Sequence, residues 1–226
     1  MVRDRRPIAW YEGRTSLDLL RGAEWAWIGL RSGDGLNRLH SDLLAALDRL
    51  FIELRWSGAR RIALSNSGWM TGRGHHFSAG ADLHEVGGLD AVSADLFSRR
   101  GQRVMSHLLW PGWHSLTVIS GVAMGGGCDL ALHGQERWAV AADQVTGKGG
   151  LRLAHPAARH GILTGFGGTW RLPDILGPEG ADRLFRRFET WAEAEALLAG
   201  AVHRVVAPDG VERELLPWLE GPAASP

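Results

Sequence analysis

The chain of 226 residues is short of cysteine and has no excess of charge of either sign. Its single cysteine, Cys128, excludes an internal disulfide and indicates a reducing compartment. Lys plus Arg and Asp plus Glu each total 25, so the formal net charge at pH 7 is +0. Because neither a basic excess nor an acidic tail is present, the composition predicts no nucleic-acid partner.

Long hydrophobic runs are also missing. No apolar stretch approaches the roughly 20 residues that a membrane-spanning helix needs. The charged residues 1–7 are not followed by the apolar run of a secretory signal. We therefore expect a cytoplasmic protein with no membrane partner. The length predicts one domain over residues 1–226, with a core at about 24–210 and a disordered tail at 221–226.

Strand-like and helix-like stretches alternate along the chain. Strand patterns occupy residues 24–31, 61–65, 115–120 and 137–142, and helix patterns occupy residues 41–54, 90–109, 178–188 and 191–198. Ser41 is placed to cap the first helix, and a further short helix is expected after Gly127. This alternation favours an α/β fold.

Two glycine-rich segments carry the chemical signal. Residues 76–83 read His-Phe-Ser-Ala-Gly-Ala-Asp-Leu, and residues 120–132 contain Met-Gly-Gly-Gly-Cys-Asp. Small residues leave backbone N–H groups uncovered, and two N–H groups aimed at one point form an oxyanion hole. The glycines also lie where a helix begins, so its dipole adds positive potential. The pair indicates a protein that polarises an acyl carbonyl, unless the glycines only permit tight turns.

Four segments, in order, make the chain resemble the crotonase superfamily, the enoyl-CoA hydratase/isomerase family, as a divergent member. They are residues 74–83, 121–131, 161–172 and, more weakly, 191–200 followed by Val205 and Val206. The resemblance implies an α/β fold, a crotonase (ClpP-like) spiral of repeated β-β-α units, here with a shortened C-terminal helical region. It also implies an acyl-CoA thioester as ligand, no cofactor beyond the coenzyme A of that substrate, and a homo-oligomer, a trimer or a dimer of trimers.

The resemblance assigns roles position by position. The backbone N–H groups of Ala81 and Gly126 are the expected oxyanion donors, and Asp129 stands where hydratases carry their first catalytic glutamate. A carboxylate one turn into that helix either faces the α-carbon of a bound thioester and moves a proton or only stabilises the helix dipole. The residues expected to contact the substrate are Arg31, Leu36, Phe77, Ala79, Gly80, Asp82, Leu83 and Gly125.

One departure from the family pattern bears on the reaction. Hydratases and many isomerases carry a glutamate directly after the proline equivalent to Pro156, and Ala157 stands there instead. Alanine neither holds water nor exchanges protons, so ordinary hydration is disfavoured. His133 and His155 are alternative bases. His133 lies one helical turn after Asp129, so it either pairs with that carboxylate or makes a structural hydrogen bond. No set of residues has the spacing of metal ligands.

The sequence thus predicts an enzyme, an acyl-CoA lyase or isomerase that stabilises an enolate, and it favours isomerase-like or hydrolase-like chemistry over hydration. The alternative is a catalytically weak family member retained as a thioester-binding or assembly subunit. The acyl group and the reaction subtype stay open.

Overall fold

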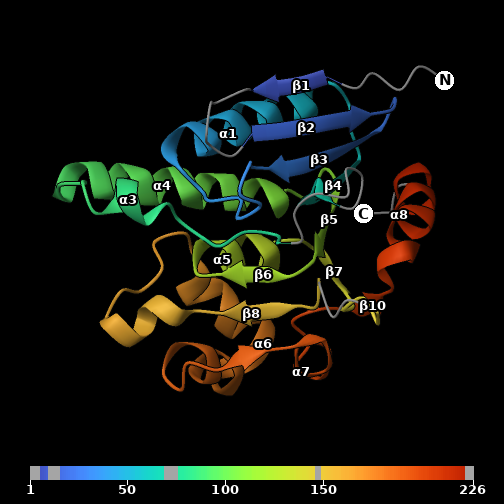
Figure 1. Cartoon of the computed structure of the whole chain (residues 1–226). Coiled ribbons are helices and arrows are strands. Elements are labelled where there is room, and N and C mark those ends of the chain that lie inside the picture. The colour runs from blue at the N-terminus through green and yellow to red at the C-terminus, as the bar shows by residue number, and fades with distance from the viewer. Residues whose placement is uncertain (1–5, 10–15, 69–75, 146–148, 222–226) are drawn as a thin grey trace.

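A computed structural model of the chain describes residues 6–9, 16–68, 76–145 and 149–221. Within these residues the strands form two sheets, with helices packed around them (Figure 1). The larger sheet contains, in spatial order, β1 (Arg6–Ala9), β2 (Ser16–Arg21), β3 (Trp25–Arg31), β4 (Arg61–Asn66), β5 (His114–Ile119), β7 (Glu136–Val140) and β10 (Arg204–Val206). The smaller sheet contains β6 (Val122–Met124), β8 (Arg152–Ala154) and β9 (Thr190–Trp191).

The central strands of the larger sheet run parallel. Leu64 in β4 pairs with Ile28 in β3 on one side and with Thr117 in β5 on the other. These strands are almost entirely buried, which explains their near-continuous apolar sequences. The outer strands β1 and β2 are added antiparallel to β3.

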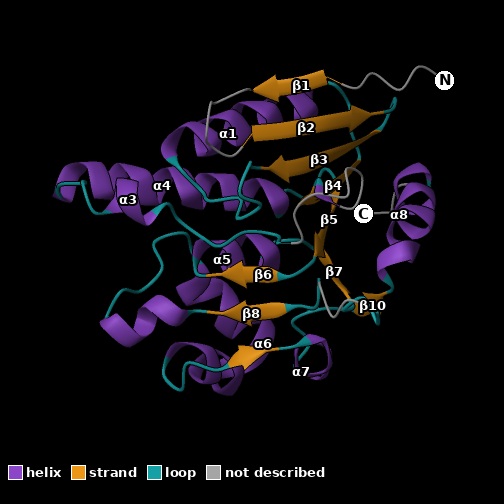
Figure 2. Cartoon of the chain, in the orientation of Figure 1, coloured by secondary structure: helices purple, strands orange, loops and turns teal. Residues whose placement is uncertain are grey.

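Helices cover both faces of the sheet (Figure 2). The helices are α1 (Ser41–Trp56), α3 (Leu83–Val86), α4 (Ala91–Leu108), α5 (Gly126–Leu132), α6 (Gly168–Phe185), α7 (Glu193–Leu198) and α8 (Val211–Glu220), with short 3-10 helices at Pro156–His160 and Pro208–Gly210. Successive strand residues point to opposite faces. Ile28 therefore joins the main core with α1, whereas its neighbour Trp27 joins a second apolar cluster with Leu215 of α8.

Several predicted elements are found, with corrections at their ends. The cap of α1 is His40 rather than Ser41, because the His40 Nδ1 accepts the N–H of Leu43 at 3.3 Å. The helix expected at 178–188 is the second half of α6, which begins at Gly168, kinks at Gly177 and ends at Phe185.

The C-terminal part of the chain also differs in detail from the expectation. Trp191 belongs to β9, and α7 begins two residues later at Glu193. The expected shortened helical region at the C-terminus contains α8, which packs on the sheet. Most of the tail expected at 221–226, from residue 222 onward, lies outside the described residues.

Candidate active site

The two glycine-rich segments lie side by side. Backbone hydrogen bonds join Phe77 N–H to the Ser120 carbonyl at 2.8 Å and Ser78 N–H to the Val122 carbonyl at 3.0 Å. Gly80, with a φ of 96°, lies very close to the second segment, because a Cβ there would lie 2.4 Å from the carbonyl oxygen of Met124. A side chain at this position would push the segments apart, which explains the glycine in physical terms.

Two backbone nitrogen atoms lie near each other where these segments meet. A Cβ built on Gly126 would lie 3.6 Å from the nitrogen of Ala81, and a Cβ built on Gly80 would lie 3.4 Å from the nitrogen of Gly126. Within the described residues, neither the Ala81 N–H nor the Gly126 N–H donates a hydrogen bond. The arrangement leaves two neighbouring donors free for an external oxygen atom.

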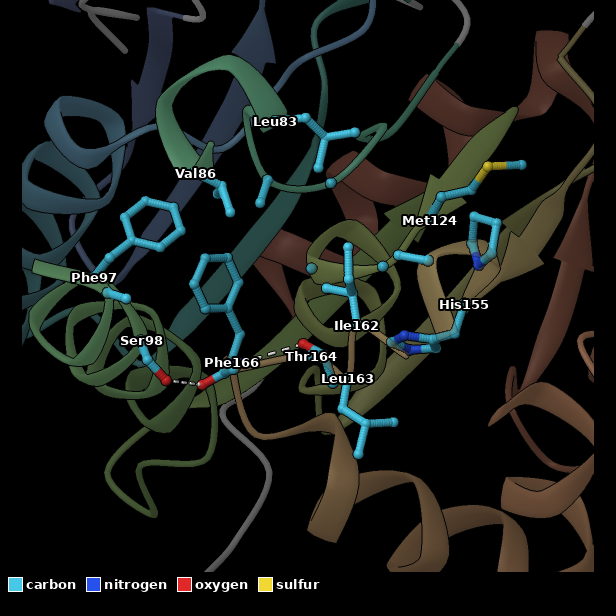
Figure 3. A pocket seen from close by; sticks show the side chains of 18 of the residues that line it. Leu83, Val86, Phe97, Ser98, Met124, His155, Ile162, Leu163, Thr164 and Phe166 are labelled. Atoms are coloured by element: carbon cyan, nitrogen blue, oxygen red, sulfur yellow. Dashed lines mark hydrogen bonds between the residues drawn. The ribbon is translucent and has the colours of Figure 1, made fainter. Parts of the chain in front are cut away.

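A cavity of about 240 Å³ opens at these donors (Figure 3). Its wall includes seven residues that the sequence placed in the site: Ala79, Gly80, Ala81, Leu83, Gly125, Gly126 and His155. Much of the remaining wall is apolar and comes from Val86, Leu89, Phe97, Ile162, Leu163 and Phe166. The shape suits an acyl group whose carbonyl oxygen reaches the two donors.

Four residues expected to bind substrate lie outside the cavity wall. Arg31 makes an ion pair with Asp18, with the Arg31 Nε to Asp18 Oδ2 distance at 3.0 Å. Phe77 is fully buried in the main core, and the side chain of Asp82 caps α3. The backbone carbonyl of Leu36 accepts a hydrogen bond from the N–H of Ala79, which lines the cavity. Their direct contact with a ligand stays a prediction.

The carboxylate of Asp129 is buried behind the cavity wall rather than exposed in it. Its exposed fraction is 0%, and it accepts a hydrogen bond from the hydroxyl of Thr164. A Cβ on Gly168 would lie 2.0 Å from Asp129 Oδ1, so the glycine lets α6 begin directly against this carboxylate. Asp129 is not among the residues that line the cavity, whereas Thr164 and His155 line it, so direct contact of Asp129 with a substrate stays a prediction.

His155 connects the buried carboxylate to the cavity. Its Nε2 lies 3.3 Å from Asp129 Oδ1, although the two atoms are not aligned as a hydrogen bond. The imidazole ring packs against the ring of Phe185, with 4.6 Å between the two ring centroids. Among the described residues that line the cavity, His155 has the only ionisable side chain.

His133, the other candidate base, has a structural role. Its Nδ1 lies 2.7 Å from the backbone carbonyl of Asp129, not from the carboxylate, so the structural hydrogen bond is the interpretation that holds. The ring packs edge-on against Trp170 at 5.5 Å, and burial lowers the pKa of His133 from 6.5 to about 4. It does not line the cavity described here.

The position of the missing second glutamate is part of the cavity wall. Ala157 lines it, so no proton-transfer group stands at that point. The hydroxyl of Ser98 donates a hydrogen bond to the carbonyl of Gly165 at 2.6 Å.

In the described parts of the chain, no cluster of three His, Cys, Asp or Glu side chains is arranged to hold a metal ion. None of the described helices is long and apolar enough to cross a membrane.

Sequence comparison identifies a family and several relatives. The sequence model of the family described as enoyl-CoA hydratase/isomerase matches residues 37–226. A crotonyl-CoA hydratase of Syntrophomonas wolfei is 34% identical over 152 residues, which are 67% of this chain and 54% of that protein. A short-chain-enoyl-CoA hydratase of Clostridium acetobutylicum is 30% identical over 174 residues, 76% of this chain and 62% of that protein. The matched parts thus span between half and two thirds of these relatives.

Solved structures share the arrangement of strands and helices. The structure of Pseudomonas aeruginosa DspI matches with a TM-score of 0.78 and 27% identity, covering 90% of this chain and 72% of that one. An enoyl-CoA hydratase structure from Thermoplasma volcanium matches with a TM-score of 0.77 and 24% identity, covering 92% of this chain and 78% of that one. The second likeness, at this identity, concerns the fold alone.

Proposed function

The chain belongs to the enoyl-CoA hydratase/isomerase family of the crotonase superfamily and has the crotonase fold, and on this basis we propose that it binds an acyl-CoA thioester and stabilises its enolate. The thioester oxygen sits between the N–H groups of Ala81 and Gly126, and the acyl chain fills the apolar cavity. Negative charge that develops on this oxygen is stabilised by two donors already in position.

One observation carries the proposal: two adjacent N–H groups without protein partners open onto an apolar cavity. Buried backbone donors without any hydrogen-bond partner are rare in native structures, because an unmet buried donor costs free energy. A thioester oxygen satisfies both donors at once, and its developing charge strengthens both hydrogen bonds. The apolar wall then contributes binding energy through the acyl chain.

The reaction we propose is isomerase-like or hydrolase-like rather than hydration. Adding water across a conjugated double bond requires one group to activate water and another to protonate the α-carbon. Ala157 supplies neither, and a single ionisable side chain lines the cavity within the described residues. The relatives from Syntrophomonas and Clostridium are named hydratases. We expect this chain to hydrate crotonyl-CoA poorly, measured as loss of the conjugated-thioester absorbance.

We further propose a cytoplasmic homo-oligomer. The thiol of Cys128 is free and buried, and burial raises its pKa well above the usual value. A chain that keeps its thiol free fits a reducing compartment. The assembly we expect is a trimer or a dimer of trimers, as the family resemblance implies.

The test is an acyl-CoA binding screen by thermal shift, followed by turnover assays of the compounds that bind. Ala81→Pro removes one N–H donor and keeps a small apolar side chain, so turnover should fall by about 10² to 10³. Circular dichroism must show that the variant is folded. A folded Ala81→Pro protein with unchanged turnover contradicts the proposal. Binding without any turnover supports the alternative, a thioester-binding subunit with weak catalysis.

A further inference from the structure

We propose that His155 is the base that moves the proton in this cavity, and that Asp129 is a positioning residue that holds its imidazole. This inference rests on the proposed thioester-binding function, because it needs the enolate that the two backbone donors stabilise. It assigns proton transfer to a histidine at a wall that otherwise offers no ionisable group within the described residues.

The strand register sets His155 beside the oxyanion donors. Strands β6 and β8 are parallel neighbours in which Met124 pairs with Ala154. The next residue of each strand is therefore Gly125 on one side and His155 on the other, and the Gly125 N–H donates to the Ala154 carbonyl at 2.9 Å. Neighbouring strands lie about 4.8 Å apart. His155 and the segment with the Gly126 N–H thus follow neighbouring strands at the same end of the small sheet.

The buried carboxylate determines which ring nitrogen is free. Asp129 Oδ1 faces His155 Nε2 at 3.3 Å, and the hydroxyl of Thr164 bonds to the other oxygen, Oδ2. The Nε2 atom is buried without a hydrogen-bond partner, whereas the residue lines the cavity. A carboxylate beside Nε2 favours the proton on that nitrogen, which leaves the lone pair on Nδ1 for the cavity. The imperfect alignment fits a site that tightens when substrate binds.

Among the described residues around the imidazole, none offers a second base to the cavity. Asp129 comes from α5, Thr164 from the loop before α6, and Phe185 from the end of α6. Asp129 has no exposed surface, and the threonine hydroxyl is used as its donor. Figure 3 shows the ring of His155 beside Ile162, and both residues line the cavity.

A single base is sufficient for moving a double bond within the acyl chain. Nδ1 of His155 takes a proton from C2 of a 3-enoyl thioester, and the C2–H electron pair forms the C1–C2 double bond of a dienolate. The negative charge resides on the thioester oxygen between Ala81 and Gly126. The imidazolium then returns the proton to C4, which leaves the conjugated C2–C3 double bond. No water, oxidant or other co-reactant is consumed.

The experiment uses the full chain with butyryl-CoA in D2O. Exchange of its C2 protons for deuterium, followed by NMR, requires a base and an oxyanion hole but no further chemistry. In parallel, conversion of a 3-hexenoyl-CoA to the conjugated thioester is followed by absorbance. We expect the wild-type protein to catalyse both, and His155→Gln to slow both by about 10² to 10⁴ with the affinity for butyryl-CoA unchanged.

Two further variants sharpen the assignment. His160→Gln makes the same chemical change at the exposed end of the 3-10 helix that follows His155. This control variant should leave both rates intact. Asp129→Asn should lower the rate of exchange by about 10²-fold or more with the affinity for butyryl-CoA unchanged, because a neutral amide no longer holds the imidazole in the productive tautomer and orientation. A merely structural Asp129 would leave the exchange rate of the folded variant in place.

The outcomes separate this inference from the function beneath it. Butyryl-CoA that binds but exchanges equally fast in wild type and in folded His155→Gln overturns the role of His155 and leaves the thioester site standing. Binding with no exchange in the wild type also overturns it. If the protein binds none of the acyl-CoAs tested, the proposed function fails and this inference fails with it.

Discussion

The carboxylate of Asp129 accepts its hydrogen bond from the hydroxyl of Thr164 in a fully buried environment. Thr164→Val keeps the shape of the side chain and removes that donor, so a buried carboxylate loses a partner. We expect unfolding in urea to show a loss of about 1–3 kcal/mol. Thr164→Ser, which keeps the hydroxyl, is the matched control and should retain most of this stability. Equal stability of the valine variant and the wild type would contradict the structure of this pair.

His133 makes the stability of the fold depend on pH. Burial lowers its pKa from 6.5 to about 4 in the folded state, while the unfolded chain keeps the ordinary value. Between these values the unfolded state binds more protons, so stability is lost as pH falls from about 6.5 towards 4, by about 3 kcal/mol.

The matched variant for this prediction is His133→Asn, whose side-chain amide still donates to the carbonyl of Asp129 but does not titrate. Other histidines also titrate in this range, so the decisive quantity is the difference between the two proteins. Urea unfolding at pH 7 and pH 4.5 should show a smaller loss for the variant. Identical pH dependence in both proteins would rule out His133 as a contributor.

Some residues of the candidate site can be identified from the sequence, and others cannot. Ala81 and Gly126 are identifiable because small residues at the end of an apolar run expose backbone N–H groups in any fold that brings the runs together. The burial of Asp129 cannot be identified from the sequence. It depends on Gly168 and Thr164, which lie 35 or more positions further along the chain and contact Asp129 only in the folded structure. The proximity of His155 depends likewise on the pairing of β6 with β8.

Helix α4 contains Gly101, a residue type with a low helix propensity. Alanine in a helix interior is normally about 1 kcal/mol better than glycine. A Cβ at Gly101, however, would lie 2.1 Å from Cδ1 of Phe166. The same ring also packs against Gly126, where a Cβ would lie 2.7 Å from Cδ2 of Phe166. Because Phe166 also packs on Phe97 at 5.2 Å between ring centroids, it has little freedom to move.

We therefore expect Gly101→Ala to destabilise the protein by about 1–3 kcal/mol, because overpacking outweighs helix propensity. The measurement is urea unfolding followed by circular dichroism. Gly33→Ala, at an exposed position with no atom within 4 Å of the added Cβ, is the control and should be close to neutral. A stabilised Gly101→Ala protein would mean that Phe166 is not held where the structure has it.

Most of the long elements were predictable, and the shortest strands were not. The expected strands at 24–31 and 61–65 correspond to β3 and β4, because buried parallel strands have continuous apolar sequences. Strands of two or three residues, such as β6 and β9, are too short to show any period. In α6, Pro173 and the kink at Gly177 hide the first half of the helix from a pattern search.

The assembly of whole chains is a property that the family resemblance predicts. We expect light scattering on purified protein to give three times the chain mass of 24.6 kDa, or twice that for a dimer of trimers. Addition of an acyl-CoA should not change this mass if the cavity is built from one chain, as its wall is here. A protein that stays monomeric at all concentrations tested would contradict the expected assembly.

The proposed function requires that the N–H groups of Ala81 and Gly126 polarise the carbonyl of a bound thioester. Infrared difference spectroscopy of an acyl-CoA labelled with ¹³C at the carbonyl measures this polarisation directly, because hydrogen bonding weakens the C=O bond. We predict that the labelled stretch of the bound ligand lies at lower frequency than that of the free ligand, and that Ala81→Pro moves it back towards the free value. A ligand that binds stoichiometrically to folded protein with its carbonyl stretch unchanged would contradict the account.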